Sequence, residues 1–152
     1  MASLVLNYFA IGFAIKLHDW IIDQSGGMKG IKDSGPLESV LDHIQNDLYY
    51  PEFEDKLTHL VFGTIQFHPF NDGNKRSSIL LGSYFLEING FGYVVQKFVK
   101  EMENIVVWVA EGKISKEFLK ELIASIIYDD EYPESLHFRL MLLVEDGTFG
   151  QG

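Results

Sequence analysis

The sequence contains no cysteine and has far fewer basic than acidic residues. Without cysteine the chain can form neither a disulfide framework nor a thiolate zinc site, and we expect a reducing compartment, the cytoplasm. The 12 basic residues stand against 22 acidic ones, which gives a formal net charge of -10. Such a charge repels nucleic acid phosphates and attracts basic protein surfaces, so we predict a protein partner and no nucleic acid.

We expect neither a membrane span nor a signal peptide in this sequence. The stretch from Leu4 to Ile22 is apolar, but Asn7, Lys16, His18 and Asp19 interrupt it, and no small-residue cleavage site follows a short apolar run. We therefore predict a buried helix there and no membrane partner. With 47% hydrophobic and 14% aromatic residues, the 152 residues are expected to form a single domain, 1–152, with a sizeable core.

What the chain does contain is a succession of helical patterns, in which apolar residues recur at spacings of three and four. The predicted helices run from Asn7, as the cap, to Gln24; from Pro36 to about Leu48; from Phe53 to Gln66; from the end of the loop 67–74 to Ile88; from about Lys97 to Ala110; from Lys116, after a Ser115 cap, to Tyr128; and from Pro133 through Leu143. The fold class is therefore all-α, a bundle of about six to seven helices. We expect the tail, about 144–152, to be flexible.

A glycine-rich segment, residues 25–35, separates the first two predicted helices. Its glycines are too dense for a helix interior and predict an exposed loop or a short hairpin before the second helix. It is either a flexible connection or a flap beside a functional site.

The run His-Pro-Phe-Asn-Asp-Gly-Asn-Lys-Arg, residues 68–76, gathers the groups needed for attack of a hydroxyl on a nucleotide. Gly73 lets backbone N–H groups at a helix start approach phosphate oxygens, and Lys75 and Arg76 add positive charge. Asp72 offers a ligand of the kind that Mg²⁺ takes beside substrate phosphates, and His68 is a base that titrates near neutral pH. Singly, such residues are more often caps, turn residues or solvated charges. The other four histidines have no metal-ligand spacing and are predicted to be structural or surface residues.

This run resembles the signature of the Fic/Doc family, and specifically of its Doc (death-on-curing) branch. Leu17-His18-Asp19, Ser25-Gly26-Gly27, Gly30-Ile31-Lys32-Asp33 and Leu37-Glu38-Ser39 also resemble Doc-type sequences, so the resemblance covers roughly residues 15–91. It implies the Fic/Doc helical bundle, ATP as substrate and Mg²⁺ as cofactor. The chain would be the toxin of a toxin–antitoxin pair.

The resemblance also implies a role for each matching position. His68 would deprotonate the hydroxyl of the target, Asp72 would hold Mg²⁺, and Phe70 would anchor the loop in the core. The positions of the phosphate site are Gly73, Asn74, Lys75 and Arg76. The flap that aligns the target polypeptide would be Gly30, Ile31, Lys32 and Asp33.

Two positions depart from the nucleotidyl-transferring members of the family. Lys75 stands where those members have a second glycine, and Ile79 stands where they have a second arginine. A lysine side chain would crowd the phosphate nest, and a cation that holds the distal phosphates in the AMP-transferring pose is missing. Doc shares both departures, which implies an inverted nucleotide whose γ-phosphate faces a Ser/Thr hydroxyl, with elongation factor Tu as the family's known target. We predict phosphate transfer ahead of AMP transfer (AMPylation); a non-catalytic, nucleotide-binding regulatory protein is a further alternative.

Many family members are restrained by a helix with the pattern Ser/Thr-x-x-x-Glu-Gly/Asn. Ser34 with Glu38 and Ser83 with Glu87 have this spacing, but the residues that follow, Ser39 and Ile88, do not fit. The resemblance therefore implies either that the restraint is an antitoxin on a separate chain or that it has been lost.

Overall fold

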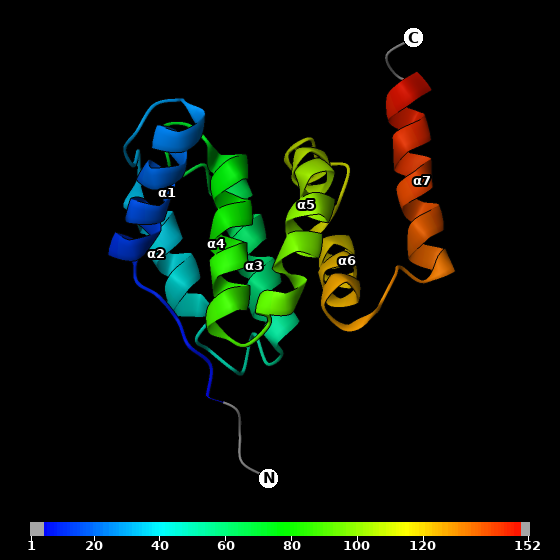
Figure 1. The fold of residues 1–152 in the computed structure, drawn as a ribbon, viewed down its shortest axis with the longest axis horizontal. Helices are drawn as coiled ribbons and strands as arrows, with labels where there is room; N and C mark the ends of the chain where they lie inside the picture. Colours follow the sequence, from blue (N-terminus) through cyan, green and yellow to red (C-terminus); the bar gives the residue numbers. More distant parts are fainter. Residues whose placement is uncertain (1–4, 150–152) are drawn as a thin grey trace.

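The computed structural model describes residues 5–149 and consists of helices joined by loops (Figure 1). The helices are α1 (Ile11–Ser25), α2 (Ser34–His43), α3 (Phe53–Phe67), α4 (Asn74–Ile88), the short 3-10 helix η1 (Gly92–Val94), α5 (Val95–Ala110), α6 (Lys116–Tyr128) and α7 (Glu134–Phe149). Among residues 5–149 the only β pairing is an isolated bridge between Ile31 and Phe70. The all-α prediction is confirmed, and residues 26–33 of the glycine-rich segment form an extended loop rather than a hairpin, while its first residue lies in α1 and its last two lie in α2.

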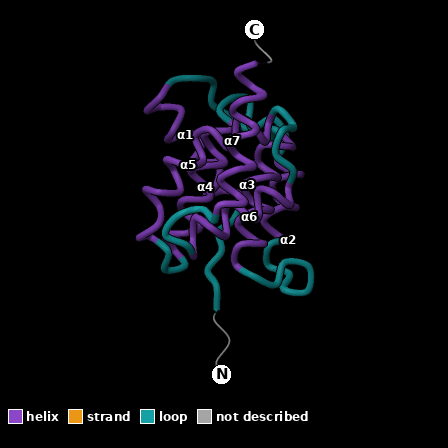
Figure 2. Tube along the Cα trace, turned by 90° about the vertical axis from the view of Figure 1, so that its right-hand side faces the viewer, coloured by secondary structure: helices purple, strands orange, loops and turns teal. Residues whose placement is uncertain are grey.

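Helices α3 and α4 form the centre of the bundle. Helix α4 packs against α1, α3 and α5, while α3 also packs against α2 and α6. The two helices run in opposite directions, and the segment 68–73 joins them at the upper end in Figure 1. We call this segment the catalytic loop after the role that the sequence predicts for it. The predicted central position of the fourth helix is confirmed, and the catalytic loop begins and ends on buried elements. The loops gather at the two ends of the bundle (Figure 2).

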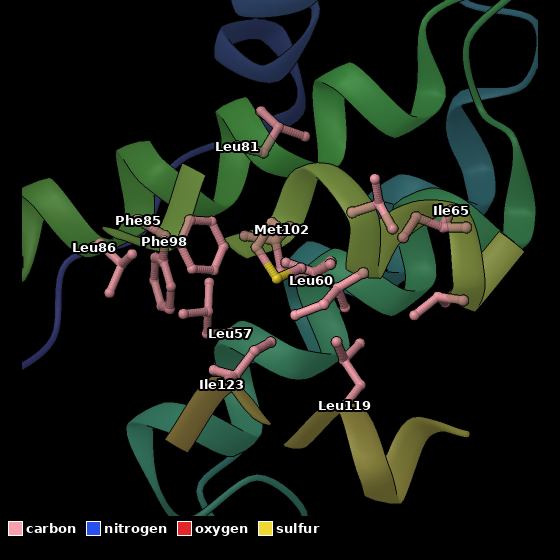
Figure 3. Close-up of a cluster of buried hydrophobic side chains, with 14 of the residues drawn as sticks. Leu57, Leu60, Ile65, Leu81, Phe85, Leu86, Phe98, Met102, Leu119 and Ile123 are labelled. Atoms are coloured by element: carbon pink, nitrogen blue, oxygen red, sulfur yellow. The ribbon is translucent and has the colours of Figure 1, made fainter. Parts of the chain in front are cut away.

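The apolar faces of four helices meet in one core (Figure 3). Its fully buried side chains include Leu57 and Leu60 of α3, Leu81 and Phe85 of α4, Phe98 and Met102 of α5, and Leu119 and Ile123 of α6. Burial of apolar surface contributes roughly 25 cal/mol per Å² to folding, so this core fixes the ends of α3 and α4 relative to each other. The catalytic loop is thereby held between two rigid supports.

Asn7 does not cap the first helix, contrary to the sequence prediction. Helix α1 begins at Ile11 with Ala10 as its N-cap. Asn7 instead donates from Nδ2 to the carbonyl of Ile88 at 2.9 Å and from its backbone N–H to Asn89 Oδ1 at 2.7 Å. These bonds connect the segment before α1 to the C-terminal end of α4.

The second helix is shorter than predicted. It begins at Ser34, where the side chain of Asp33 caps it by accepting a hydrogen bond from Gly35 N–H at 3.1 Å, and it ends at His43 rather than near Leu48. Tight turns follow before α3 begins at Phe53.

The C-terminal helices agree with the sequence prediction more closely. Helix α6 has the predicted bounds, and Ser115 caps it by accepting from Phe118 N–H at 3.1 Å. Helix α7 extends to Phe149, past the predicted end at Leu143, and residues 150–152 of the predicted flexible tail lie outside the described residues. Within residues 5–149, no helix has both the length and the apolar character that a membrane crossing requires.

Candidate active site

His68 ends α3 and opens the catalytic loop in a left-handed backbone conformation, with φ 48° and ψ 56°. It is the only non-glycine residue with positive φ among those described. This conformation costs a residue with a side chain roughly 1–2 kcal/mol, and such strain is concentrated at functional sites. The side chain of His68 is exposed, so a hydroxyl group on another protein can reach it.

Phe70 and Asn74 hold the catalytic loop closed. Phe70 is only 1% exposed, as an anchor must be. Asn74 Oδ1 accepts from the backbone N–H of Phe70 at 3.0 Å, and Asn74 Nδ2 donates to the carbonyl of Phe70 at 3.1 Å. Both polar ends of the Asn74 side chain are therefore engaged within the loop, and its contact with phosphate stays a prediction.

The start of α4 provides an anion cradle. Gly73 is the N-cap, with φ 72°, and the first helical hydrogen bond of α4 runs from Ser77 N–H to the Gly73 carbonyl at 2.8 Å. The N–H groups of residues 74–76 come before that bond, at the positive end of the helix dipole, where helices commonly bind phosphate. A Cβ on Gly73 would lie 2.9 Å from Ile22 Cδ1 and 3.1 Å from Arg76 Nη2, which are the ends of flexible side chains, so the positive φ is the main reason for glycine here.

Asp72 is an ionised carboxylate at the mouth of this cradle. Hydrogen bonds from Met28 N–H to Oδ2 at 3.1 Å and from Gly73 N–H to Oδ1 at 2.8 Å lower the pKa of Asp72, and Arg76 lowers it further. Its side chain is 47% exposed. No cluster of three or more His, Asp or Glu side chains suited to a metal ion occurs within residues 5–149. A lone exposed carboxylate fits Mg²⁺, which commonly takes one or two protein carboxylates together with substrate phosphates and waters.

Arg76 connects the cradle to the end of α1. Its Nη1 donates to Ser25 Oγ and, at 2.8 Å, to the carbonyl of Gly26, while Nη2 lies 3.9 Å from Asp72 Oδ1. A guanidinium has five N–H donors, so Nε and Nη2 can still serve a phosphate oxygen. Lys75, the other cation of the cradle, is exposed.

The flap, residues 30–33, lies directly alongside the catalytic loop. Lys32 N–H and Asp33 N–H both donate to the carbonyl of Pro69, at 2.7 Å and 3.1 Å, and Asn71 N–H donates to the carbonyl of Gly30 at 3.1 Å. The side chain of Asn71 adds a hydrogen bond to the Lys29 carbonyl at 3.2 Å. The structure thus brings the predicted flap to the predicted catalytic loop; its alignment of a target polypeptide stays a prediction.

The sequence interpretation treated His18 as a structural or surface histidine and missed its place beside the site. His18 is 0% exposed, and its Nε2 donates to the carbonyl of Asp72 at 2.6 Å. Its ring stacks on Phe70, with centroids 3.9 Å apart and planes 3° apart. Two features of the sequence could have indicated this place. His18 is a polar residue within the apolar pattern of α1, and it belongs to the segment Leu17-His18-Asp19, which resembles Doc-type sequences.

Two comparisons with known proteins show which family this chain resembles. The sequence profile of the Fic/DOC family matches residues 8–86, which include α1 to α3, the flap, the catalytic loop and most of α4. The chain therefore belongs to the Fic/DOC family. It is also similar to a protein named "Protein kinase doc" from Escherichia phage P1, with 38% identity over 106 residues that cover 66% of this chain and 80% of that protein.

Proposed function

We propose that this chain transfers the γ-phosphate of ATP to a Ser/Thr hydroxyl of another protein. The observation that carries the proposal is the joining of an exposed base, an ionised carboxylate and a helix-start anion cradle within one loop, at His68, Asp72 and Gly73. The similarity to protein kinase Doc supports phosphate as the transferred group. A translation factor such as elongation factor Tu is the proposed target.

The chemistry needs few groups because phosphoryl transfer depends mainly on positioning and charge stabilisation. The attacking hydroxyl oxygen forms a bond to the γ-phosphorus while the bond from that phosphorus to the β,γ-bridging oxygen breaks, and ADP leaves. The proton of the hydroxyl passes to the imidazole of His68. The N–H groups of residues 74–76 and the guanidinium of Arg76 stabilise the phosphate charge. Asp72 would hold Mg²⁺, which supplies further neutralisation of the phosphates.

Two side chains favour phosphate over AMP transfer. Lys75 is exposed at the second position of α4, among the residues whose N–H groups form the cradle, and AMP-transferring members have glycine at this position. Ile79, one turn further along α4, is partly buried and packs against the hydrophobic core, so no cation is available there. Both features support a nucleotide that lies in the opposite direction from that of the AMP-transferring enzymes.

The direct test uses ATP labelled at either the γ- or the α-phosphate, with Mg²⁺ and purified translation factors as acceptors. We expect only the γ-label to reach a protein, with a gain of one phosphate in its intact mass. Transfer of the α-label and a gain of AMP would establish the alternative activity. His68→Ala should abolish either transfer, and nucleotide binding with no transfer to any protein would favour the non-catalytic alternative.

Lys75 provides a second test of which phosphate is transferred. Lys75→Gly should give measurable transfer of the α-label, because it removes the bulk that crowds the cradle. Lys75→Met is the matched control, since it keeps the bulk and loses the charge, and it should still transfer the γ-label. Equal α-label transfer by both variants would show that the charge of Lys75, and not its bulk, orients the nucleotide.

We also propose that the chain acts as a toxin restrained by an antitoxin on a separate chain. The two candidates for an inhibitory motif lie in α2 and α4, and Ser83 of the second is only 9% exposed in the middle of the bundle. Neither candidate is followed by the Gly or Asn of the inhibitory pattern, which supports a restraint on a separate chain. Expression of the chain alone should arrest growth, and the His68→Ala variant should not.

A further inference from the structure

The segment Leu17-His18-Asp19 of α1 lies beside the catalytic loop but takes no part in the proposed chemistry. His18 is completely buried, although its ring is polar, and a buried polar group is costly unless it is hydrogen-bonded. Its Nε2 lies 2.6 Å from the carbonyl oxygen of Asp72. Because a carbonyl oxygen only accepts, Nε2 must carry the hydrogen of this bond. Through this bond α1 holds the backbone of Asp72, the candidate Mg²⁺ ligand.

His18 makes a second contact with the same loop through its ring. It stacks nearly parallel to Phe70, at a centroid distance of 3.9 Å. Phe70 and Asp72 are two residues apart, so one imidazole fixes both the side chain of the first and the backbone of the second. Asn71, the residue between them, therefore has a neighbour held by His18 on each side.

The neighbour of His18 reaches the flap. Asp19 Oδ1 faces His18 Nδ1 at 3.1 Å and also accepts from Gly30 N–H at 3.4 Å. The carbonyl of the same Gly30 accepts from Asn71 N–H in the catalytic loop. A closed circuit of contacts therefore runs from α1 to the catalytic loop, across to the flap and back to α1.

We propose that His18 and Asp19 form a positioning pair that holds the catalytic loop and the flap at one separation. This inference rests on the proposed transfer function, because it assigns the pair to the alignment of His68 and Asp72 with a substrate. Neither member of the pair belongs to the cradle or touches the reacting atoms in the proposed reaction. Their effect is exerted through Asp72, Phe70 and Gly30.

Two substitutions of His18 separate its hydrogen bond from its packing. His18→Gln keeps an N–H donor close to the position of Nε2, whereas His18→Phe keeps an aromatic ring for the stack and leaves the Asp72 carbonyl without a donor. We expect His18→Phe to lower kcat for γ-label transfer about 10- to 100-fold, as small misplacements of reacting groups do, with the KM for ATP changed by less than about threefold. His18→Gln should keep kcat within about threefold of the unsubstituted protein. His137→Gln, at an exposed histidine of α7, is the control and should change neither constant.

A second measurement does not depend on activity. Amide hydrogen exchange at Lys32, Asp33 and Asn71, which donate between the flap and the loop, should be faster in His18→Phe than in His18→Gln, while exchange at Phe118 in α6 should be the same. If the unsubstituted protein transfers no phosphate, the proposed function fails, and these exchange rates still decide the positioning inference.

Equal losses of kcat in the two His18 variants would overturn the inference, as would unchanged exchange at the three amides. If His18→Phe does not fold, Asp19→Ala takes its place. That variant leaves the bond from His18 to Asp72 intact, and it should speed exchange at Gly30 and lower kcat. Unchanged exchange and unchanged kcat in Asp19→Ala would show that the pair does not position the flap.

Discussion

At the scale of the residue, His68 joins the proposed base to a backbone conformation that glycine adopts more easily. The left-handed turn takes the chain out of α3 and into the catalytic loop, and a side chain in that conformation is a source of strain. A residue chosen only for stability at this position would be glycine, which commonly ends helices in this way. The presence of histidine is consistent with a chemical requirement that outweighs the strain.

We predict that His68→Gly abolishes transfer and raises the free energy of unfolding by about 1 kcal/mol, because the strain is relieved. His68→Ala should abolish transfer without this gain, since alanine keeps a Cβ. Urea unfolding of the two variants and the labelled-ATP assay give the two quantities. A His68→Gly variant less stable than His68→Ala would show that the backbone at this position is not strained.

The residues of the catalytic loop could be predicted from the sequence because they are contiguous. His68, Asp72 and Arg76 fall within one run, and no knowledge of the fold is needed to see them together. His18 and Ser25 could not be placed in the same way, because each meets its partner across about 50 positions of sequence. Their contacts exist only once α1 packs against the start of α4.

At the scale of the element, the connection between α1 and α2 lies against the catalytic loop over its whole length. Before it reaches the flap it passes Gly27, where a Cβ would lie 2.6 Å from Asp72 Oδ2 and 3.1 Å from Arg76 Nη2. The backbone of this connection therefore approaches the site so closely that a Cβ at Gly27 would displace either the Asp72 carboxylate or the connection itself. Gly27 is therefore explained by this close contact and not only by the flexibility that glycine gives to a loop.

We predict that Gly27→Ala impairs transfer at least about tenfold, because the added methyl group pushes the connection away from Asp72 and removes the bond from Met28 N–H. Gly26→Ala is a matched control: Gly26 also has positive φ, at 85°, but a Cβ there meets nothing within 4 Å. Gly27 also has positive φ, at 123°, so both variants carry backbone strain, and only Gly27→Ala should alter the Mg²⁺ concentration needed for half-maximal transfer. The same Mg²⁺ requirement in both variants would contradict the close approach to Asp72.

The helices themselves were predictable to different degrees. Helix α6 begins directly after a favourable cap, Ser115, and ends where the regular spacing of its apolar residues ends, so its bounds could be predicted. The start of α1 was misjudged, because Asn7 is a favourable cap by type and finds its partner in Asn89, more than 80 positions away. Local propensity was overridden by a tertiary contact, which no local pattern records.

At the scale of the whole molecule, a second group of polar side chains affects stability away from the active site. Lys116 Nζ lies 2.9 Å from His59 Nδ1, the hydroxyl of Tyr50 lies 3.3 Å from the same atom, and the ring of His43 lies 5.9 Å from that of His59. Burial lowers the pKa of His59 to about 4, and the positive charges of Lys116 and His43 contribute. The folded protein therefore keeps this imidazole neutral.

The sign of the effect on stability follows from linkage. Because the pKa of His59 is lower in the folded state than in the unfolded chain, the unfolded chain binds the extra proton between about pH 6.5 and pH 4, and stability falls as the pH falls through that window. His59 is only partly buried, so with solvent screening we expect a loss of about 1 kcal/mol between pH 7 and pH 5. Urea unfolding at both pH values measures it. His59→Gln should reduce the loss by that amount, and an identical loss in the variant would mean that other groups cause it.

The bonds between Asn7 and Asn89 have a practical consequence for handling the protein. They hold the start of the described chain at the end of α4 opposite to the catalytic loop, at a separation of about 22 Å if α4 rises by 1.5 Å per residue (Figure 1). A dye or a surface linkage attached beside Asn7 would leave the loop end of the bundle facing solution. Immobilised in that orientation, the protein could be presented with intact, folded acceptor proteins rather than peptides.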